Sequence, residues 1–258
     1  MLGIFRKKSA IDEDFFEWAI CIAEWVIANF DGIEQLRQTP LVTPSLDFFP
    51  ASREQGHDRA LELFERVKLY ADMADWSCEL IPQDKRLPDE ISDGVLQKFQ
   101  RNAPLGTFSE AIKSNEIVST ITYDPSLTKK PTDLIATLSH ELAHLLMTAA
   151  QGEFPFPPEM EEPATDSLAI MMGFGIFIAN GSSGFRADDA GWEYHRSGYL
   201  CEGEILHVLS VFLFLSGNSL DLLKPFLKPA LFKRVQKIHR DVVERPEVIA
   251  LTSPTSTS

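Results

Sequence analysis

Two histidines and a glutamate in the stretch His140-Glu141-Leu142-Ala143-His144 have the types and spacing of a metal-dependent catalytic site. Residues four apart lie on one face of a helix, so the imidazoles of His140 and His144 can reach one metal ion. Glu141 lies about 100° further round the helix, close enough to accept a proton from water on that metal. The alternative is a helix with two core histidines. It would bury three polar groups at a cost of several kcal/mol unless strong partners were present, so the spacing predicts a metal site.

The segment around this motif predicts a buried helix. Asp133–Ala149 contains no Gly or Pro and is apolar on nearly every side. Pro131 and Thr132 before it offer a helix start, and Gly152 after it offers a stop. Such a helix runs through the middle of its domain.

A zinc site with two histidines and one position open to water needs a third protein ligand. Residues 161–166, EEPATD, open the next apolar run. Glu162 and Asp166 share one face of a helix, where Glu162 can ligate zinc and Asp166 can accept the N–H of a ligating histidine. Glu161 and Glu159 stay open as alternative ligands, and the alternative without metal is a solvated acidic helix start.

Two other classes of zinc enzyme are excluded by the residues that follow the motif. The metzincin pattern continues with Gly and His at places that hold Met147 and Ala150 here. The zinc deaminases need a Cys-x-x-Cys, which the sequence does not contain.

The two motifs together resemble the gluzincin metallopeptidases, the thermolysin-like group, in which HExxH is followed on a later helix by Glu-x-x-x-Asp. The resemblance covers residues 140–166. It implies a zinc ion (Zn2+) as cofactor and the following roles: His140, His144 and Glu162 as zinc ligands, Glu141 as general base, and Asp166 as the partner of a ligating histidine.

The resemblance also implies the reaction of a zinc-dependent peptidase. Zinc-bound water, activated by Glu141, would attack a peptide carbonyl. Peptidases of this type use a Tyr or His to stabilise the oxyanion, and Tyr194, His195 and Tyr199 are three alternatives for that role. A competing hypothesis is a catalytically silent zinc-binding domain that acts in regulation or partner binding. A third is a helical protein without metal.

The hydrophobic periodicity predicts a mostly helical α+β fold, with a small sheet packed against the buried HExxH helix, and the resemblance implies that this fold is zincin-like. The expected helices span residues 11–30, 57–74, 91–99, 162–179, 203–215 and 220–243, and the expected strands span 76–81 and 116–123. In the gluzincin arrangement the strand before the HExxH helix is the sheet edge along which an extended substrate lies; the alternative is a core strand. His207, on an apolar helix, is expected to be a core residue.

No composition shift or repeat divides the chain, so a single zincin-like domain is expected over residues 1–258. We expect it to consist of an N-terminal helical part (1–75), the sheet and metal-bearing helices (76–180), a helical C-terminal part (181–250) and a disordered tail (251–258).

Composition limits the partners. A net charge of −14 argues against nucleic acid and anionic membranes as partners. A peptide or protein substrate is what the resemblance implies. Three cysteines far apart suit a reducing compartment, and the longest apolar stretches are too short to span a bilayer. We therefore expect a cytoplasmic protein; its oligomeric state is left open.

Overall fold

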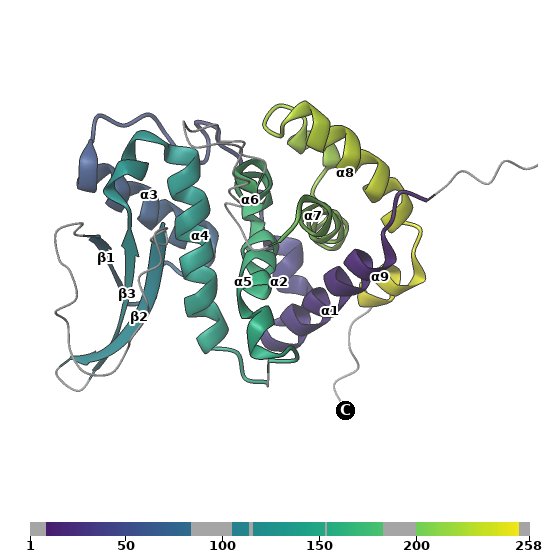
Figure 1. Cartoon of the computed structure of the whole chain (residues 1–258), viewed down its shortest axis with the longest axis horizontal. Coiled ribbons are helices and arrows are strands. Elements are labelled where there is room, and N and C mark those ends of the chain that lie inside the picture. Colours follow the sequence, from purple (N-terminus) through teal and green to yellow (C-terminus); the bar gives the residue numbers. More distant parts are fainter. Residues whose placement is uncertain (1–8, 84–104, 114–115, 153, 183–199, 253–258) are drawn as a thin grey trace, which may run out of the picture.

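Helices make up most of the described residues, and the one small sheet found among them lies at one side of the molecule (Figure 1). The computed structural model describes residues 9–83, 105–113, 116–152, 154–182 and 200–252. The α-helices are α1 (Glu13–Asn29), α2 (Gly32–Gln38), α3 (Gly56–Tyr70), α4 (Pro131–Thr148), α5 (Glu161–Ala169), α6 (Gly175–Ser182), α7 (Glu202–Ser216), α8 (Pro229–Val242) and α9 (Pro246–Leu251). The strands are β1 (Cys78–Pro82), β2 (Gly106–Lys113) and β3 (Glu116–Tyr123).

The sheet has the order β1-β3-β2, with β1 parallel and β2 antiparallel to β3. The expected strand over 116–123 is confirmed, and of the two positions left open for it, sheet edge or core, the structure shows the core position. It is the central strand, because β1 pairs with one side of it and β2 with the other. The strand β2, which the sequence analysis did not predict, is the edge strand that packs against α4.

One glycine sets how closely β2 approaches α4. A Cβ atom at Gly106 would lie 2.8 Å from Glu141 Oε1 and 2.7 Å from Thr137 Cγ2. Those distances are shorter than real Cβ contacts, so any larger residue would force the strand or the helix to shift. Gly106 therefore lets the edge strand lie directly over Glu141.

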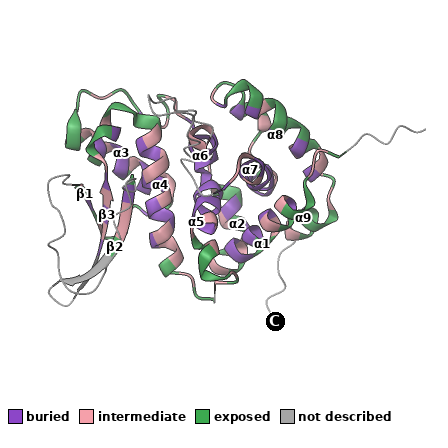
Figure 2. Cartoon of the chain, viewed as in Figure 1, coloured by how far each residue is buried: buried purple, intermediate pink, exposed green. Residues whose placement is uncertain are grey.

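The helix α4 lies between the sheet on one side and α5 and α6 on the other, while α3 lies on the sheet side of α4 (Figure 1). The apolar helix α7 is buried along nearly its whole length (Figure 2) and packs between α1 and α8. Burial of α4 from both sides explains why its sequence is apolar all round, and it places the HExxH motif at the junction of the sheet with the helical part.

The expected helix over 162–179 is interrupted. A π-helical turn over Ile170–Phe174 separates α5 from α6, and Gly173 adopts a φ of +95°. The carbonyl oxygen of Gly173 accepts a hydrogen bond from the Val42 N–H at 3.0 Å, and a Cβ at Gly173 would lie 2.2 Å from the carbonyl oxygen of Pro40. The break thus lets the connector after α2 pack against the helix backbone.

The helical segment Pro158–Ser182 has 25 residues and, by length and composition, could cross a membrane. The segment is longer than the apolar stretch seen in the sequence. Of its most apolar 18 residues, however, 89% are buried inside the molecule. This is the burial of a core helix in a soluble protein.

The other expected elements that lie within the described residues agree with the structure, except in the region 220–243. The helices expected over 11–30, 57–74 and 203–215 correspond to α1, α3 and α7, and β1 corresponds to the strand expected over 76–81. The region 220–243 contains a short 3-10 helix, Leu220–Leu223, before α8. The expected short helix at 91–99 lies outside the described residues, as do 253–258 of the expected tail. The single-domain division stays a prediction.

Candidate metal centre

Two facing helix surfaces bring the predicted residues together. The helix α4 presents His140 and His144, four residues apart, and α5 presents Glu162 and Asp166 with the same spacing. The sequence favours this placement, because Pro131 begins α4, and because Glu161 and Glu162 lie in the first turn of α5, where they complement the helix dipole.

One ligand atom from each of His140, His144 and Glu162 lies within 4.8 Å of the other two. The Oε2 atom of Glu162 is 3.2 Å from His140 Nε2 and 3.5 Å from His144 Nε2. The two imidazole rings are nearly perpendicular, at 82°, with centroids 4.8 Å apart. The three side chains therefore converge on one point, as ligands of a single ion do.

The donor set fits a metal ion. Glu162 Oε2 is buried, and among the described residues it has no hydrogen bond of good geometry, although both imidazoles lie close to it. A buried carboxylate oxygen without a hydrogen bond is costly, and a cation between it and the two nitrogens would compensate for that cost. Two imidazoles and one carboxylate are a common ligand set of catalytic zinc, although other divalent ions accept it as well.

Asp166 orients the imidazole ring of His140 through its Nδ1 atom. The Nδ1–H of His140 donates to Asp166 Oδ1 at 2.8 Å, which leaves Nε2 facing Glu162. The other oxygen, Oδ2, accepts the backbone N–H of Leu200 at 3.4 Å, so the start of α7 is also held at this carboxylate. Asp166 is thus the outer partner of a candidate ligand, as the sequence analysis proposed.

The charges of the cluster reinforce each other when no metal is bound. Burial lowers the pKa of His140, but its contacts with Asp166 and Glu162 outweigh burial and raise that pKa to about 10. Burial opposes ionisation of Glu162, but the adjacent imidazoles of His140 and His144 outweigh it and lower its pKa to about 2. The site therefore holds an ionised carboxylate beside protonatable imidazole, and a metal ion would replace the proton.

Glu141 lies on the same helix but outside the three-residue cluster. It is only 5% exposed, and Gly106 of β2 lies directly against its carboxylate. Burial raises the pKa of Glu141, although the neighbouring His140 and His144 act in the opposite direction. A buried carboxylate with a raised pKa beside a ligand cluster has the environment of a general base.

The structure separates the three acidic residues that the sequence left as alternative ligands. Glu161 is 57% exposed on its side chain, and its Oε1 lies 3.9 Å from Nδ1 of His144, the nitrogen that points away from Glu162. Glu159 is exposed. Glu162 is the carboxylate that lies within the cluster.

Tyr194, His195 and Tyr199, the alternatives for oxyanion stabilisation, lie outside the described residues. Their role stays a prediction.

The chain matches no protein-family model, no curated protein and no solved structure. Membership of the gluzincins and a zincin-like fold therefore stay proposals that rest on the two motifs and on the geometry above.

One residue at the site was missed by the sequence analysis. Thr165 is fully buried, and its Oγ1 lies 3.3 Å from His144 Nδ1. Threonine is too common for its type to mark a site. Its position does carry a signal, since Thr165 lies three residues after Glu162 and thus on the face of α5 that meets α4.

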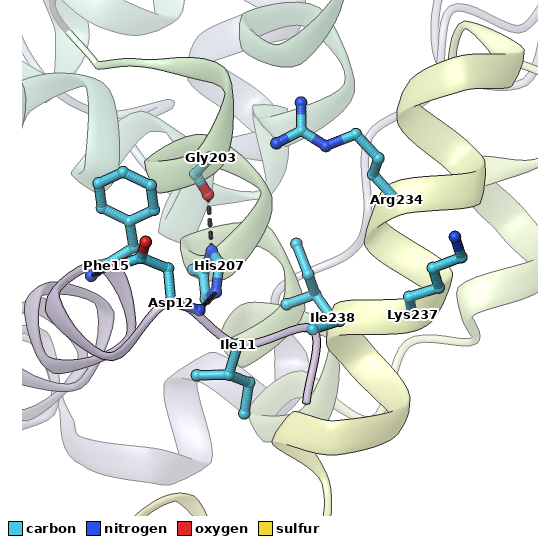
Figure 3. A pocket seen from close by; sticks show the side chains of 9 residues that line it. Ile11, Asp12, Phe15, Gly203, His207, Arg234, Lys237 and Ile238 are labelled. Atoms are coloured by element: carbon cyan, nitrogen blue, oxygen red, sulfur yellow. Dashed lines mark hydrogen bonds between the residues drawn. The ribbon is translucent and has the colours of Figure 1, made fainter. Parts of the chain in front are cut away.

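A separate pocket of about 380 Å³ lies between the start of α1, α7 and α8 (Figure 3). His207 lines it, but both of its ring nitrogens are engaged. Nδ1–H donates to the carbonyl oxygen of Gly203 at 2.7 Å, and Nε2 accepts the Asp12 N–H at 3.1 Å. The expectation that His207 is a core residue is confirmed.

Proposed function

We propose that this protein is a zinc-dependent hydrolase that cleaves peptide bonds, with the ligands and base of a gluzincin. The observation that carries the proposal is the convergence of His140, His144 and Glu162 beside a buried Glu141 on the same helix. A purely structural zinc site is closed by four protein ligands and needs no adjacent carboxylate base. The described residues supply three ligands, and the side chain of Glu162 is 40% exposed, so solvent reaches the cluster.

A bound zinc ion would supply Lewis acidity, which acidifies water and stabilises negative charge on an attacked carbonyl. Glu141 then accepts the proton of the attacking water and passes it to the leaving amine. Its raised pKa serves both steps, because a base whose pKa lies nearer neutrality can also return the proton. Asp166 keeps the His140 ring in place throughout.

The substrate proposed for this site is an extended peptide. Within the described sheet, β2 pairs with β3 on one side only, so its other backbone edge is available for pairing. This edge begins at Gly106, directly over Glu141. A peptide added to β2 by backbone hydrogen bonds would thus pass the general base, and such pairing binds main chain with little demand on sequence.

The remaining parts of the proposal come from the sequence. We propose that one of Tyr194, His195 and Tyr199 stabilises the oxyanion. A cytoplasmic location is supported by three free cysteines among the described residues, Cys21, Cys78 and Cys201. A peptide or protein substrate is supported by the net charge of −14, which disfavours nucleic acid and anionic membranes as partners.

The decisive experiment for catalysis compares wild type with Glu141→Gln on a peptide library, after zinc content has been measured in both. The variant is expected to keep its zinc and to lose about 10²–10⁴-fold in hydrolysis rate. Glu161→Gln is the matched control, because it removes an exposed carboxylate near His144 and should leave the rate nearly unchanged.

Equal hydrolysis by wild type and Glu141→Gln would contradict the proposed mechanism. Zinc-loaded wild type that cleaves no peptide in the library would favour the alternative function instead, a silent zinc-binding domain that acts in regulation or partner binding.

A further inference from the structure

The two histidines of α4 have different outer partners. His140 is held by a carboxylate, that of Asp166, at 2.8 Å. His144 is held by a hydroxyl, that of Thr165, at 3.3 Å. Thr165 and Asp166 are consecutive in α5 and together with Glu162 form one helix face, at positions i, i+3 and i+4. This face meets the His140 and His144 face of α4.

The hydroxyl of Thr165 has one proton, and its surroundings decide where that proton goes. Thr165 Oγ1 lies 2.9 Å from the carbonyl oxygen of Glu161, which is the best acceptor in reach, and 3.2 Å from the weakly accepting Met147 Sδ. If the proton is donated to Glu161, the hydroxyl can only accept from His144. The Nδ1 atom of His144 must then carry a proton.

We propose that Thr165 is the positioning residue of His144. By accepting the Nδ1–H it fixes the ring so that Nε2 faces Glu162 Oε2, 3.5 Å away, and is free to bind a metal. The Glu161 carbonyl that Thr165 binds belongs to the turn of α5 that also carries Glu162. Thr165 thus couples the ligand on α4 to the ligand on α5. The inference rests on the proposed metal centre but not on peptide hydrolysis.

The test pairs Thr165→Val with Thr165→Ser. Valine keeps the shape of threonine and removes the hydroxyl, whereas serine keeps the hydroxyl. Zinc affinity, measured by competition with a chromophoric chelator, is expected to fall about 10–100-fold in Thr165→Val, as for other lost outer partners, and to be largely restored in Thr165→Ser.

Ser167→Ala is the matched structural control. Ser167 is also buried in α5 and donates to the carbonyl four residues back, that of Pro163, at 2.9 Å, and it accepts from Trp18 Nε1 at 3.0 Å. Its loss should destabilise the fold as much as Thr165→Val does. Since the Ser167 hydroxyl contacts Trp18 and the Pro163 carbonyl and, within the described part of the chain, neither histidine ring, zinc affinity should not change. Equal zinc affinity in wild type and Thr165→Val, or an equal loss in Ser167→Ala, would overturn the proposal.

A second measurement needs no zinc. Long-range ¹H–¹⁵N NMR of the metal-free protein shows which imidazole nitrogens carry protons. The proposal expects a proton on Nδ1 of His144, and Thr165→Val should exchange that proton faster with solvent. A bare Nδ1 in wild type would mean that Thr165 donates to His144, which overturns the proposal even if the metal centre is correct. Conversely, a protein that binds no zinc but shows a protonated, slowly exchanging Nδ1 would contradict only the metal centre.

Discussion

His207 of α7, which is buried, and His239 of α8, which is half-buried, show the contacts of a histidine that only stabilises the fold. In His207 one nitrogen donates to the Gly203 carbonyl and the other accepts the Asp12 N–H. His239 has its Nδ1 3.0 Å from the hydroxyl and 3.2 Å from the carbonyl oxygen of Ser210. Burial lowers the pKa of both. These histidines are kept neutral and are held by groups of the fold.

His140 and His144 of α4 are half-buried, like His239, but have different contacts. In His140 and His144 the Nδ1 atom lies against an outer partner, Asp166 or Thr165, while both Nε2 atoms face the same oxygen of Glu162. The pKa of His140 is raised, because contacts with two carboxylates outweigh its burial. Burial therefore does not distinguish a ligand from a core histidine. The distinction lies in whether one nitrogen is fixed and the other is left facing further ligand atoms.

The largest effect is expected from exchanging the carboxylate on which the α4 histidines converge. Glu162→Gln should weaken zinc binding by more than the roughly 100-fold that the loss of an outer partner costs, since it removes a ligand. Glu161→Gln, one residue away, should change zinc affinity little because its carboxylate lies outside the cluster. Chelator competition measures both. The reverse ranking would assign the ligand role to Glu161.

For His207 of α7, the comparison predicts a loss of stability without a loss of zinc affinity. His207→Ala should lower the free energy of unfolding of the metal-free protein by about 2–4 kcal/mol, from two lost hydrogen bonds and a cavity. Zinc affinity should stay at the wild-type value. Urea denaturation gives the free energy of unfolding, and chelator competition gives the zinc affinity. A loss of zinc affinity without a loss of stability would contradict the distinction between His207 and the histidines of α4.

A smaller effect is expected where β2 crosses α4. Gly106→Ala should cost about 1–3 kcal/mol of stability through overpacking against Glu141 and Thr137. It should also slow hydrolysis while zinc stays bound, because the displaced group is the proposed base. Gly181→Ala is the control, since a Cβ there meets nothing within 4 Å. If Gly106→Ala matched Gly181→Ala in stability and rate, the close packing at Glu141 would have no functional role.

The smallest effect is expected in the pH dependence of the stability of the metal-free protein. The pKa of His140 is raised from 6.5 to about 10, so its stabilising contribution in the metal-free protein is complete below pH 6.5 and is lost as the pH rises to about 10. The pKa of Glu162 is lowered from 4.5 to about 2, so its contribution is present above pH 4.5 and is lost as the pH falls to about 2.

Zinc binding must release the His140 proton, so zinc affinity should rise about tenfold per pH unit in the range where metal-free His140 is protonated. Asp166→Asn removes the main stabilising contact of that proton and should flatten the dependence near its upper end. Zinc affinities measured from pH 6 to 9 in wild type and Asp166→Asn test this prediction. A wild-type zinc affinity that does not change with pH would contradict the release of the His140 proton on zinc binding.

The sequence predicted the parts of the site that depend on local pattern. The spacing of His140 and His144, and that of Glu162 and Asp166, each follow from helix geometry, and the apolar segment between Pro131 and Gly152 set the position of α4 within a few residues. The alternation of residues 116–123 gave the bounds of β3. These features need no information from distant parts of the chain.

The features that were missed depend on contacts between distant segments. The pairing of β1 with β3 makes β3 central, and no local pattern in residues 116–123 encodes that partner. The break at Gly173 follows from the approach of the Pro40 carbonyl, more than a hundred residues earlier in the chain. Thr165 became a candidate only when α5 was packed against His144.

The most direct test of the metal centre is metal analysis of purified wild-type protein beside His144→Ala and His207→Ala. The account predicts about one zinc per chain in wild type and in His207→Ala, and its loss in His144→Ala. Wild-type protein that is folded, free of metal and unable to take up added zinc would contradict the account, and His140 and His144 would then be core histidines like those of α7 and α8.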